Sequence, residues 1–271
     1  MNDSVAVPPA PSAGDTGPGS AGNITLALPE VRSIGFAAPL KWLGLGWRDM
    51  WRQPAASLFY GVAIAVTGAV ILGVTANLPY LFAAAITGFL LVAPMLAAGL
   101  YELSRRYLAD ERASLVDSML AWQRNPSALV SFGLLSILAG TAWQVASIII
   151  VAVFYKGSTL GPMDMMIEVM VNPQHYLMFF IYICAGGVFA AVVFAFSVVS
   201  MPMLVDRRCE LLCALTTSIN AVAENPRPLA FWAFIIMLLT GLGFATALVG
   251  LIVVMPWLGH ASFHAYKDLV E

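Results

Sequence analysis

The sequence predicts an all-α, polytopic membrane protein with six transmembrane helices, arranged as three degenerate helical hairpin repeats with amphipathic helices at the cytoplasmic face. Its residues are 60% hydrophobic and only 10% charged, whereas about 25% of the residues of a soluble domain are charged. Several apolar tracts approach the roughly 20 residues that a helix needs to cross the hydrocarbon core. Nearly all of the 13 Lys and Arg residues fall on one side of these tracts, and such a bias marks the cytoplasmic side of a membrane protein.

Residues 1–35 are predicted to form a disordered tail, and residues 36–271 a six-helix transmembrane domain. The tail is rich in Pro, Gly, Ser and Ala and has no apolar run, so burial cannot offset the entropy lost on ordering it. It also lacks the basic and apolar regions of a signal peptide. The next segment, 36–53, combines three Trp residues with Lys and Arg, which is typical of a helix at the level of the lipid headgroups.

The apolar tracts divide into pairs joined by short connections. The predicted crossings are 55–77, 80–101, 128–155, 176–205, 229–246 and 247–266, which form hairpins of about 55–101, 128–205 and 229–266. The last two are cut from one long apolar stretch without a polar loop, with the turn expected near Gly241 or Gly243. Two short crossings or one broken helix both fit this stretch. With the basic residues on the cytoplasmic side, an even number of crossings places both termini in the cytoplasm.

Two proline markers recur in the three hairpins. A proline at the start of a helix loses no hydrogen bond, whereas one inside a membrane helix frees a carbonyl that a neighbouring helix or water must satisfy. The markers at the hairpin starts are Gln53–Pro54, Asn125–Pro126 and Asn225–Pro226, and those in the returning helices are Pro94, Pro202 and Pro256. We therefore expect kinks at the second set, and three units related by an axis along the membrane normal.

A titratable residue follows each returning-helix proline at the same spacing: Glu102, Glu210 and His264. Ionisable groups inside a membrane mark functional sites by default, so these three, together with Pro94, Pro202 and Pro256, are the candidate functional residues. One interpretation is that they converge on an ion or proton path. The other is that they lie in the headgroup zone and pair with nearby arginines, including Arg105 and Arg207.

Two groups of residues have the chemistry of metal ligands. Cys209 with Cys213 and His260 with His264 are spaced four residues apart, and two such pairs on facing helices could hold zinc. The 156–175 loop offers thioethers and an imidazole, which select Cu(I), although its spacing also fits an amphipathic helix on the outer surface. The loop residues are Met163, Met165, Met166, Met170 and His175, with Met178 just beyond. We expect neither metal nor any other cofactor.

The function expected first is that of a structural or accessory protein, not an enzyme, because no catalytic motif is present. Small-residue faces allow close helix packing and would bind other membrane proteins or further copies of the chain. These faces are Gly61, Ala65 and Gly68, and Ala84 and Gly88. The alternatives are a small-solute or ion transporter that uses the titratable set, and a copper-handling membrane protein. Lipid is the expected surrounding, and nothing indicates nucleic-acid binding.

Several segments resemble an uncharacterised family of bacterial integral membrane proteins, the domain of unknown function 2189. The resemblance covers residues 38 to about 267 and rests on three segments: Leu40-Lys41-Trp42-Leu43-Gly44-Leu45-Gly46-Trp47-Arg48-Asp49, Pro54 with Ser57-Leu58-Phe59-Tyr60-Gly61, and Pro94 with Leu100-Tyr101-Glu102-Leu103-Ser104-Arg105-Arg106. It implies a multi-pass protein of the bacterial inner membrane. The family has no established activity, so the resemblance implies no catalytic residue.

Overall fold

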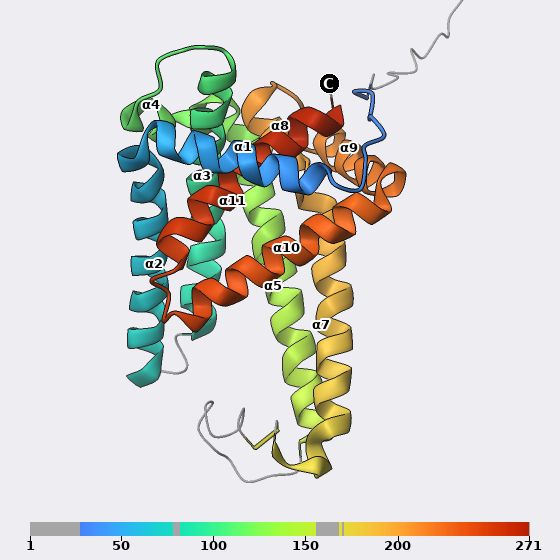
Figure 1. The fold of residues 1–271 in the computed structure, drawn as a ribbon. Coiled ribbons are helices and arrows are strands. Elements are labelled where there is room, and N and C mark those ends of the chain that lie inside the picture. Colours follow the sequence, from blue (N-terminus) through green and yellow to red (C-terminus); the bar gives the residue numbers. More distant parts are fainter. Residues whose placement is uncertain (1–27, 78–81, 156–167, 170, 271) are drawn as a thin grey trace, which may run out of the picture.

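The computed structural model describes residues 28–77, 82–155, 168–169 and 171–270. Within these residues every regular element is a helix (Figure 1), so the all-α class is confirmed. The helices are α1 (Ala38–Arg52), α2 (Pro54–Asn77), α3 (Phe82–Leu108), α4 (Leu115–Met119), η2 (Ala121–Arg124), α5 (Pro126–Phe154), η3 (Pro173–His175), α7 (Tyr176–Ser197), α8 (Ser200–Asp206), α9 (Leu211–Glu224), α10 (Pro226–Ala245) and α11 (Leu251–Val270).

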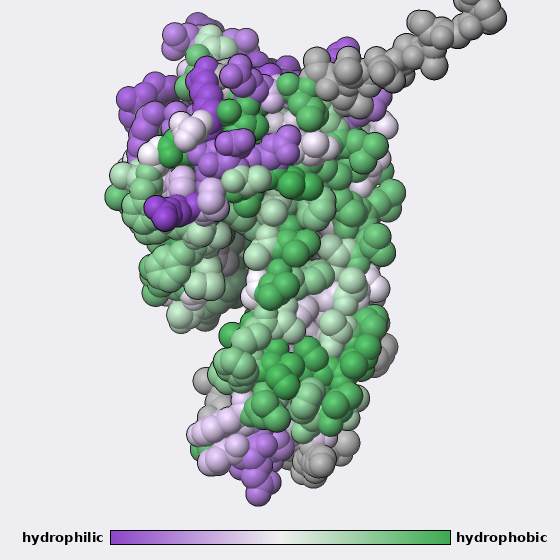
Figure 2. All heavy atoms as spheres, turned by 90° about the vertical axis from the view of Figure 1, so that its right-hand side faces the viewer, coloured by the Kyte–Doolittle hydropathy of each residue, from purple (hydrophilic) through white to green (hydrophobic). Residues whose placement is uncertain are grey.

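Four helical stretches of the described chain are long and apolar enough to cross a bilayer: Pro54–Val74, Pro126–Phe154, Pro173–Asp206 and Pro226–Ala245. Helix α11 is not among them, since its second half carries polar and charged side chains such as His264. Figure 2 shows hydrophilic residues concentrated at the end of the molecule that holds α1, α4 and α9, with an apolar belt beyond it. We call the hydrophilic end, which carries arginines such as Arg48 and Arg105, the cationic end.

Each hairpin begins at the expected proline. Helices α2, α5 and α10 start at Pro54, Pro126 and Pro226, and each follows a helix at the cationic end, namely α1, η2 and α9. The amide residue between the two helices adopts similar backbone angles at all three junctions. The values of φ and ψ are −145° and 74° at Gln53, −147° and 64° at Asn125, and −127° and 50° at Asn225.

The side chains of these junction amides bond to other parts of the cationic end. Gln53 bonds to the end of α3 in its own hairpin, Asn125 to the loop between α8 and α9, and Asn225 to the segment before α1. The bonds are Tyr107 Oη to Gln53 Oε1 (3.2 Å), Asn125 Nδ2 to the Cys209 carbonyl (2.9 Å), the Ile34 N–H to Asn225 Oδ1 (2.8 Å) and Asn225 Nδ2 to the Arg32 carbonyl (2.9 Å). The Asn225 bonds therefore join the third hairpin to the segment that precedes the first.

Residues 28–35 have no regular secondary structure but are held against the helices. The Arg32 N–H donates to the Leu269 carbonyl at 2.8 Å, and Val31 and Ile34 pack on the apolar core of the cationic end. The predicted tail boundary at residue 35 is therefore too late, because backbone hydrogen bonds to distant parts of the chain hold this segment in place. Residues 1–27 lie outside the described residues.

The third apolar stretch forms a helical hairpin and not one broken helix. The turn lies between Ala245 and Leu251, where Ala247 and Leu248 have φ of 52° and 72°. The predicted position of the turn, near Gly241 or Gly243, is therefore wrong. Thr246 organises it instead: its Oγ1 accepts from the Gly250 N–H (2.7 Å) and donates to the Gly243 carbonyl (2.8 Å).

Glycine at position 243 serves helix packing, since a Cβ there would overlap with the Leu251 side chain. In Figure 1 the turn between α10 and α11 lies nearer the cationic end than the far ends of α5 and α7 do. The third hairpin is thus shorter than the second.

The kink expected at Pro202 is present as a helix break. Helix α7 ends at Ser197 and α8 begins at Ser200, just ahead of Pro202. The Ser218 hydroxyl is inserted there: it accepts from the Val199 N–H at 3.2 Å and donates to the Ala195 carbonyl at 2.7 Å. A side chain of α9 thus supplies hydrogen bonds to the backbone groups at the helix break, as expected for a helix interrupted within a membrane protein.

The other two prolines lie inside helices that continue past them. Helix α3 runs through Pro94 and α11 through Pro256, which removes the N–H that would bond to the Ile252 carbonyl. Gly61 of α2 lies directly against this carbonyl oxygen, and a Cβ at position 61 would overlap with it. The absence of a side chain at position 61 therefore lets α2 approach α11 where the proline has freed a carbonyl.

The small-residue face of α2 is thus used inside the chain. Gly61 contacts Ile252, Ala65 is buried, and Gly68 lies against Leu248. The expectation that this face binds a partner helix is wrong, because α11 covers it. The second face, Ala84 and Gly88, has side-chain positions outside the described residues.

Candidate functional site

A buried network of polar side chains joins α1, α2, α3 and α11 at the cationic end. His264 Nε2 lies 2.7 Å from Asp49 Oδ2, to which the Ser104 hydroxyl also donates at 3.0 Å. Ser104 Oγ lies 2.7 Å from His260 Nδ1, and His260 Nε2 lies 2.9 Å from Ser57 Oγ. All five residues are at least nine-tenths buried.

The donors in this network can be assigned from the single proton of each hydroxyl. Since Ser104 donates to Asp49, its oxygen must accept from the Nδ1–H of His260, and His260 Nε2 then accepts from Ser57. His264 donates its Nε2–H to the carboxylate of Asp49. The network is therefore fully satisfied with His260 neutral, which fits its burial.

Asp49 is the charged centre of the network. Burial raises the pKa of its carboxyl, but the hydrogen bond and charge of His264 and the bond from Ser104 outweigh this, so the net pKa is lowered. The Arg52 guanidinium lies 4.0 Å from the same carboxylate. Asp49 is thus held ionised in a site from which water is excluded.

A second charged cluster surrounds Glu102, which is only 1% exposed. Arg105 binds its carboxylate through two nitrogens at 2.8 and 2.9 Å, Arg106 Nε donates at 2.8 Å, and Arg124 Nη1 lies 3.6 Å away. Burial raises the pKa of Glu102, whereas the bonds from Arg105 and Arg106 and the charge of Arg124 lower it by more. Glu102 is therefore an anchor for three arginines.

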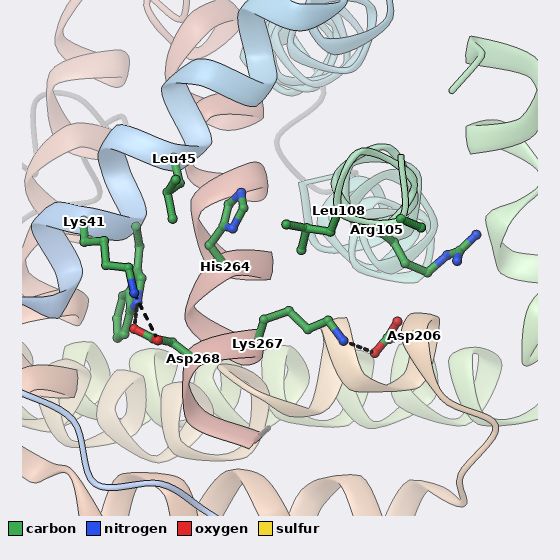
Figure 3. Close-up of a pocket in the computed structure, with 10 residues that line it drawn as sticks. Lys41, Leu45, Arg105, Leu108, Asp206, His264, Lys267 and Asp268 are labelled. Carbon is green, nitrogen blue, oxygen red and sulfur yellow. Dashed lines mark hydrogen bonds and ion pairs between the residues drawn. The ribbon is translucent and has the colours of Figure 1, made fainter. Parts of the chain in front are cut away.

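A cleft of about 480 Å³ opens between α1, α3, α8 and α11. Figure 3 shows an ion pair on each side of it, Lys41 with Asp268 (3.3 Å) and Lys267 with Asp206 (3.1 Å). His264 lies between Leu45 and Leu108 in the same view. His264 lines the cleft while Ser57 and Ser104 are fully buried, so His264 is the most accessible residue of the network.

The three titratable candidates do not converge. Glu102 is bound by its arginines and His264 by Asp49, whereas Glu210 is exposed at the N-cap of α9. Arg105, the partner of Glu102, lines the same cleft as His264. Glu102 and His264 are thus near the same cleft but have separate partners. Among the candidate prolines, Pro202 and Pro256 are buried.

The two pairs proposed as zinc ligands lie in different surroundings. His260 and His264 belong to the polar network, whereas Cys213 is buried in the apolar core and Cys209 packs against it. Within the part of the chain that the structure describes, no three His, Cys, Asp or Glu residues are grouped as metal ligands. Burial raises the pKa of the Cys209 thiol to about 11, which disfavours the thiolate that zinc requires.

Only the end of the methionine-rich loop is described. Met163, Met165, Met166 and Met170 lie outside the described residues. His175 is buried, stacks on Tyr155 at 5.0 Å and lies 3.5 Å from Glu168 through Nε2. The surface-helix and copper interpretations of this loop both stay predictions.

Sequence reasoning missed Asp49, Ser57 and Ser104. Ser57 lies 203 positions from its partner His260, and Asp49 lies 215 positions from its partner His264. No local sequence pattern therefore links these residues. One signal was present: the His260 and His264 spacing places two imidazoles on one helix face. Together with the same spacing of Cys209 and Cys213, that signal predicted a zinc site.

Comparison with known proteins supports the membrane assignment. No curated protein and no solved structure matches the chain. Residues 81–206 match the model of a family described as predicted integral membrane protein (DUF2189). The match spans α3 to α8, including Glu102 and Ser104, and is shorter than the resemblance over 38 to about 267. The chain is thus an integral membrane protein, and its residues 81–206 match the DUF2189 family.

Proposed function

We propose that the protein is a structural or accessory component of the bacterial inner membrane, without enzymatic activity, that binds another membrane protein through the α5–α7 hairpin. The observation that carries this proposal is the side chain of Gln144, which has no hydrogen-bond partner among the described residues and lies in the apolar stretch of α5 that is not buried inside the protein.

The residues of α5 that are buried inside the protein lie near its start, from Ala128 to Gly133. None of the residues in the most apolar window of α5 is buried inside the protein. Trp143 stacks on Phe189 at 5.5 Å and meets Tyr182 edge-on at 5.3 Å, and Ser147 bonds to Tyr182 at 3.1 Å. Figure 2 shows the lower part of the hairpin as an apolar column that stands clear of the other helices.

The side-chain amide of Gln144 favours a protein partner over lipid at this surface. Its amide is partly exposed within an apolar stretch that continues to Phe154, and it makes no hydrogen bond to any described residue. Lipid tails offer no hydrogen bond, and an unpaired amide in an apolar medium costs about 2–7 kcal/mol. Side-chain amides in membrane helices typically bond across a helix interface. A partner helix with a polar group would satisfy Gln144.

The orientation that we propose follows from the charges. Cationic residues at one end support a cytoplasmic location for that end, and both termini then lie in the cytoplasm. The three junctions with similar backbone angles support three hairpin repeats with six membrane segments around an axis along the membrane normal. The third pair of segments is the shortest.

Purification of the full chain in mild detergent tests the function. We expect a membrane protein to co-purify with the wild type and to be lost from Gln144→Leu. Ser136→Ala is the matched control on the same helix, because the Ser136 hydroxyl is already satisfied by the Phe132 carbonyl at 2.9 Å. Retention of every co-purifying protein by Gln144→Leu would contradict the proposal.

A transporter is not favoured by any specific observation. Glu102 is bound by three arginines and Glu210 is exposed at the cationic end, so neither supplies a free carboxylate at membrane depth. Copper handling rests on methionines outside the described residues.

A further inference from the structure

Three arginines line a small hollow at the cationic end of the second hairpin. Its volume is about 210 Å³, and its lining is Arg124, Val205, Asp206, Arg207 and Arg208. Arg124 ends η2 just before α5, and the other two arginines follow α8. The hollow thus lies at the cationic end, between the start of α5 and the end of α8.

The hollow is held in shape by contacts that do not involve a ligand. Asn125 Nδ2 donates to the Cys209 carbonyl at 2.9 Å, which ties the start of α5 to the loop after α8. Arg207 Nε donates to the Tyr266 hydroxyl at 2.8 Å. The loop that carries Arg207 and Arg208 is therefore fixed relative to Arg124.

The arginines of the hollow differ in how closely they are paired. Among the described residues that line it, Asp206 is the one carboxylate; it lies 4.0 Å from Arg207 Nε and accepts from Lys267 at 3.1 Å and from Tyr266 at 2.8 Å. The carboxylate next to Arg124 is Glu102, at 3.6 Å, and its closer partners are Arg105 and Arg106. Arg208 is exposed and forms no ion pair with any residue that the structure describes.

Guanidinium groups match one class of anion best. Their planar pairs of N–H donors bind phosphate oxygens two at a time, which a lysine ammonium cannot do. At the level of the helix ends, phosphate is supplied by phospholipid headgroups of the same leaflet or by soluble phosphate from the aqueous side. We propose that Arg124, Arg207 and Arg208 form a binding site for a phosphate group.

Titration of the purified full chain with short-chain phosphatidic acid, with native mass spectrometry as the readout, tests this site. Arg124→Gln with Arg208→Gln is the informative pair, because Arg207 also supports the fold through Tyr266. Loss of charged hydrogen bonds from both side chains should weaken binding about tenfold or more. Arg208→Lys keeps the charge but loses the paired donors, so it should give an intermediate loss.

The matched control replaces two exposed arginines of the same end, Arg48→Gln with Arg227→Gln. We expect the control to change binding by less than about twofold, since general attraction falls off within a Debye length. Equal losses in both double variants, or no binding of phosphatidic acid by the wild type, would overturn the proposal. Competition with inorganic phosphate separates the sources: displacement of the lipid indicates a soluble phosphate ligand, and its absence indicates a headgroup.

Discussion

The cationic end and the α5–α7 hairpin bury their side chains to very different extents. At the cationic end, Trp42, Trp232 and Tyr266 are fully buried, and charged residues such as Asp49 are enclosed with their partners. In the hairpin, large apolar residues such as Leu138, Phe180 and Val188 are mostly exposed. The comparison indicates that long-range polar contacts specify the fold at one end, whereas lipid or a partner covers the other.

The largest effect is expected from removing the carboxylate at the centre of the polar network. Asp49→Ala leaves His264 and Ser104 without their shared acceptor, and breaking a buried ion pair costs about 3–5 kcal/mol. Thermal unfolding in detergent, followed by circular dichroism, measures the loss. The exposed neighbour provides the control, since Arg48→Ala should change stability by less than about 0.5 kcal/mol. Equal stability of the two variants would show that the network does not hold the cationic end together.

A methyl group at Gly61 should destabilise the α2–α11 contact by about 1–3 kcal/mol, the usual cost of overpacking. Gly61→Ala places a Cβ against the Ile252 carbonyl, whereas the same change at Gly187 of α7 meets nothing within 4 Å. Denaturation of both variants gives the difference. We expect a loss of stability only at position 61, and a loss only at position 187 would contradict the comparison of the two regions.

The pH dependence of stability should come from the cationic end. The pKa values of Asp49 and Glu102 are lowered in the fold from ordinary values of 3.8 and 4.5. The unfolded chain therefore binds more protons in the acid range, so the stability from these carboxylates is complete above the ordinary values and is lost as pH falls through the folded ones.

Glu102→Gln isolates one of these contributions. The variant should be less stable than the wild type at pH 7, and the difference in stability should narrow as the pH falls through the lowered pKa of Glu102, below its ordinary value of 4.5. Unfolding midpoints measured at several pH values give the difference. A difference that widens in acid would contradict the assignment of Glu102 as an ionised anchor.

The smallest effect is expected at the break between α7 and α8. Ser218→Ala removes the hydroxyl inserted between the Val199 N–H and the Ala195 carbonyl, and the loss of such bonds costs about 1 kcal/mol. Ser197→Ala is the control, because its hydroxyl makes only one long bond of 3.4 Å, to the Phe194 carbonyl. Chemical denaturation with both variants checks the difference, and a larger loss from Ser197→Ala would rule out the structural role of Ser218.

Local signals in the sequence predicted the starts of helices but not their partners. Pro54, Pro126 and Pro226 begin helices because a proline at the first position suits the helix backbone wherever it occurs. The turn of the third hairpin was misplaced, since it uses positive φ at Ala247 and Leu248, residues that rarely adopt it. Asp49 could not be paired with His264 from a sequence in which 215 positions separate them.

The difference between the two regions is tested most directly by photo-crosslinking in intact membranes. A photoreactive residue at position 144 should form adducts with another protein chain, and the same residue at position 232, where Trp232 is fully buried, should form none. Lipid adducts alone at position 144 would contradict the account, because they would show that the α5–α7 hairpin has no protein partner.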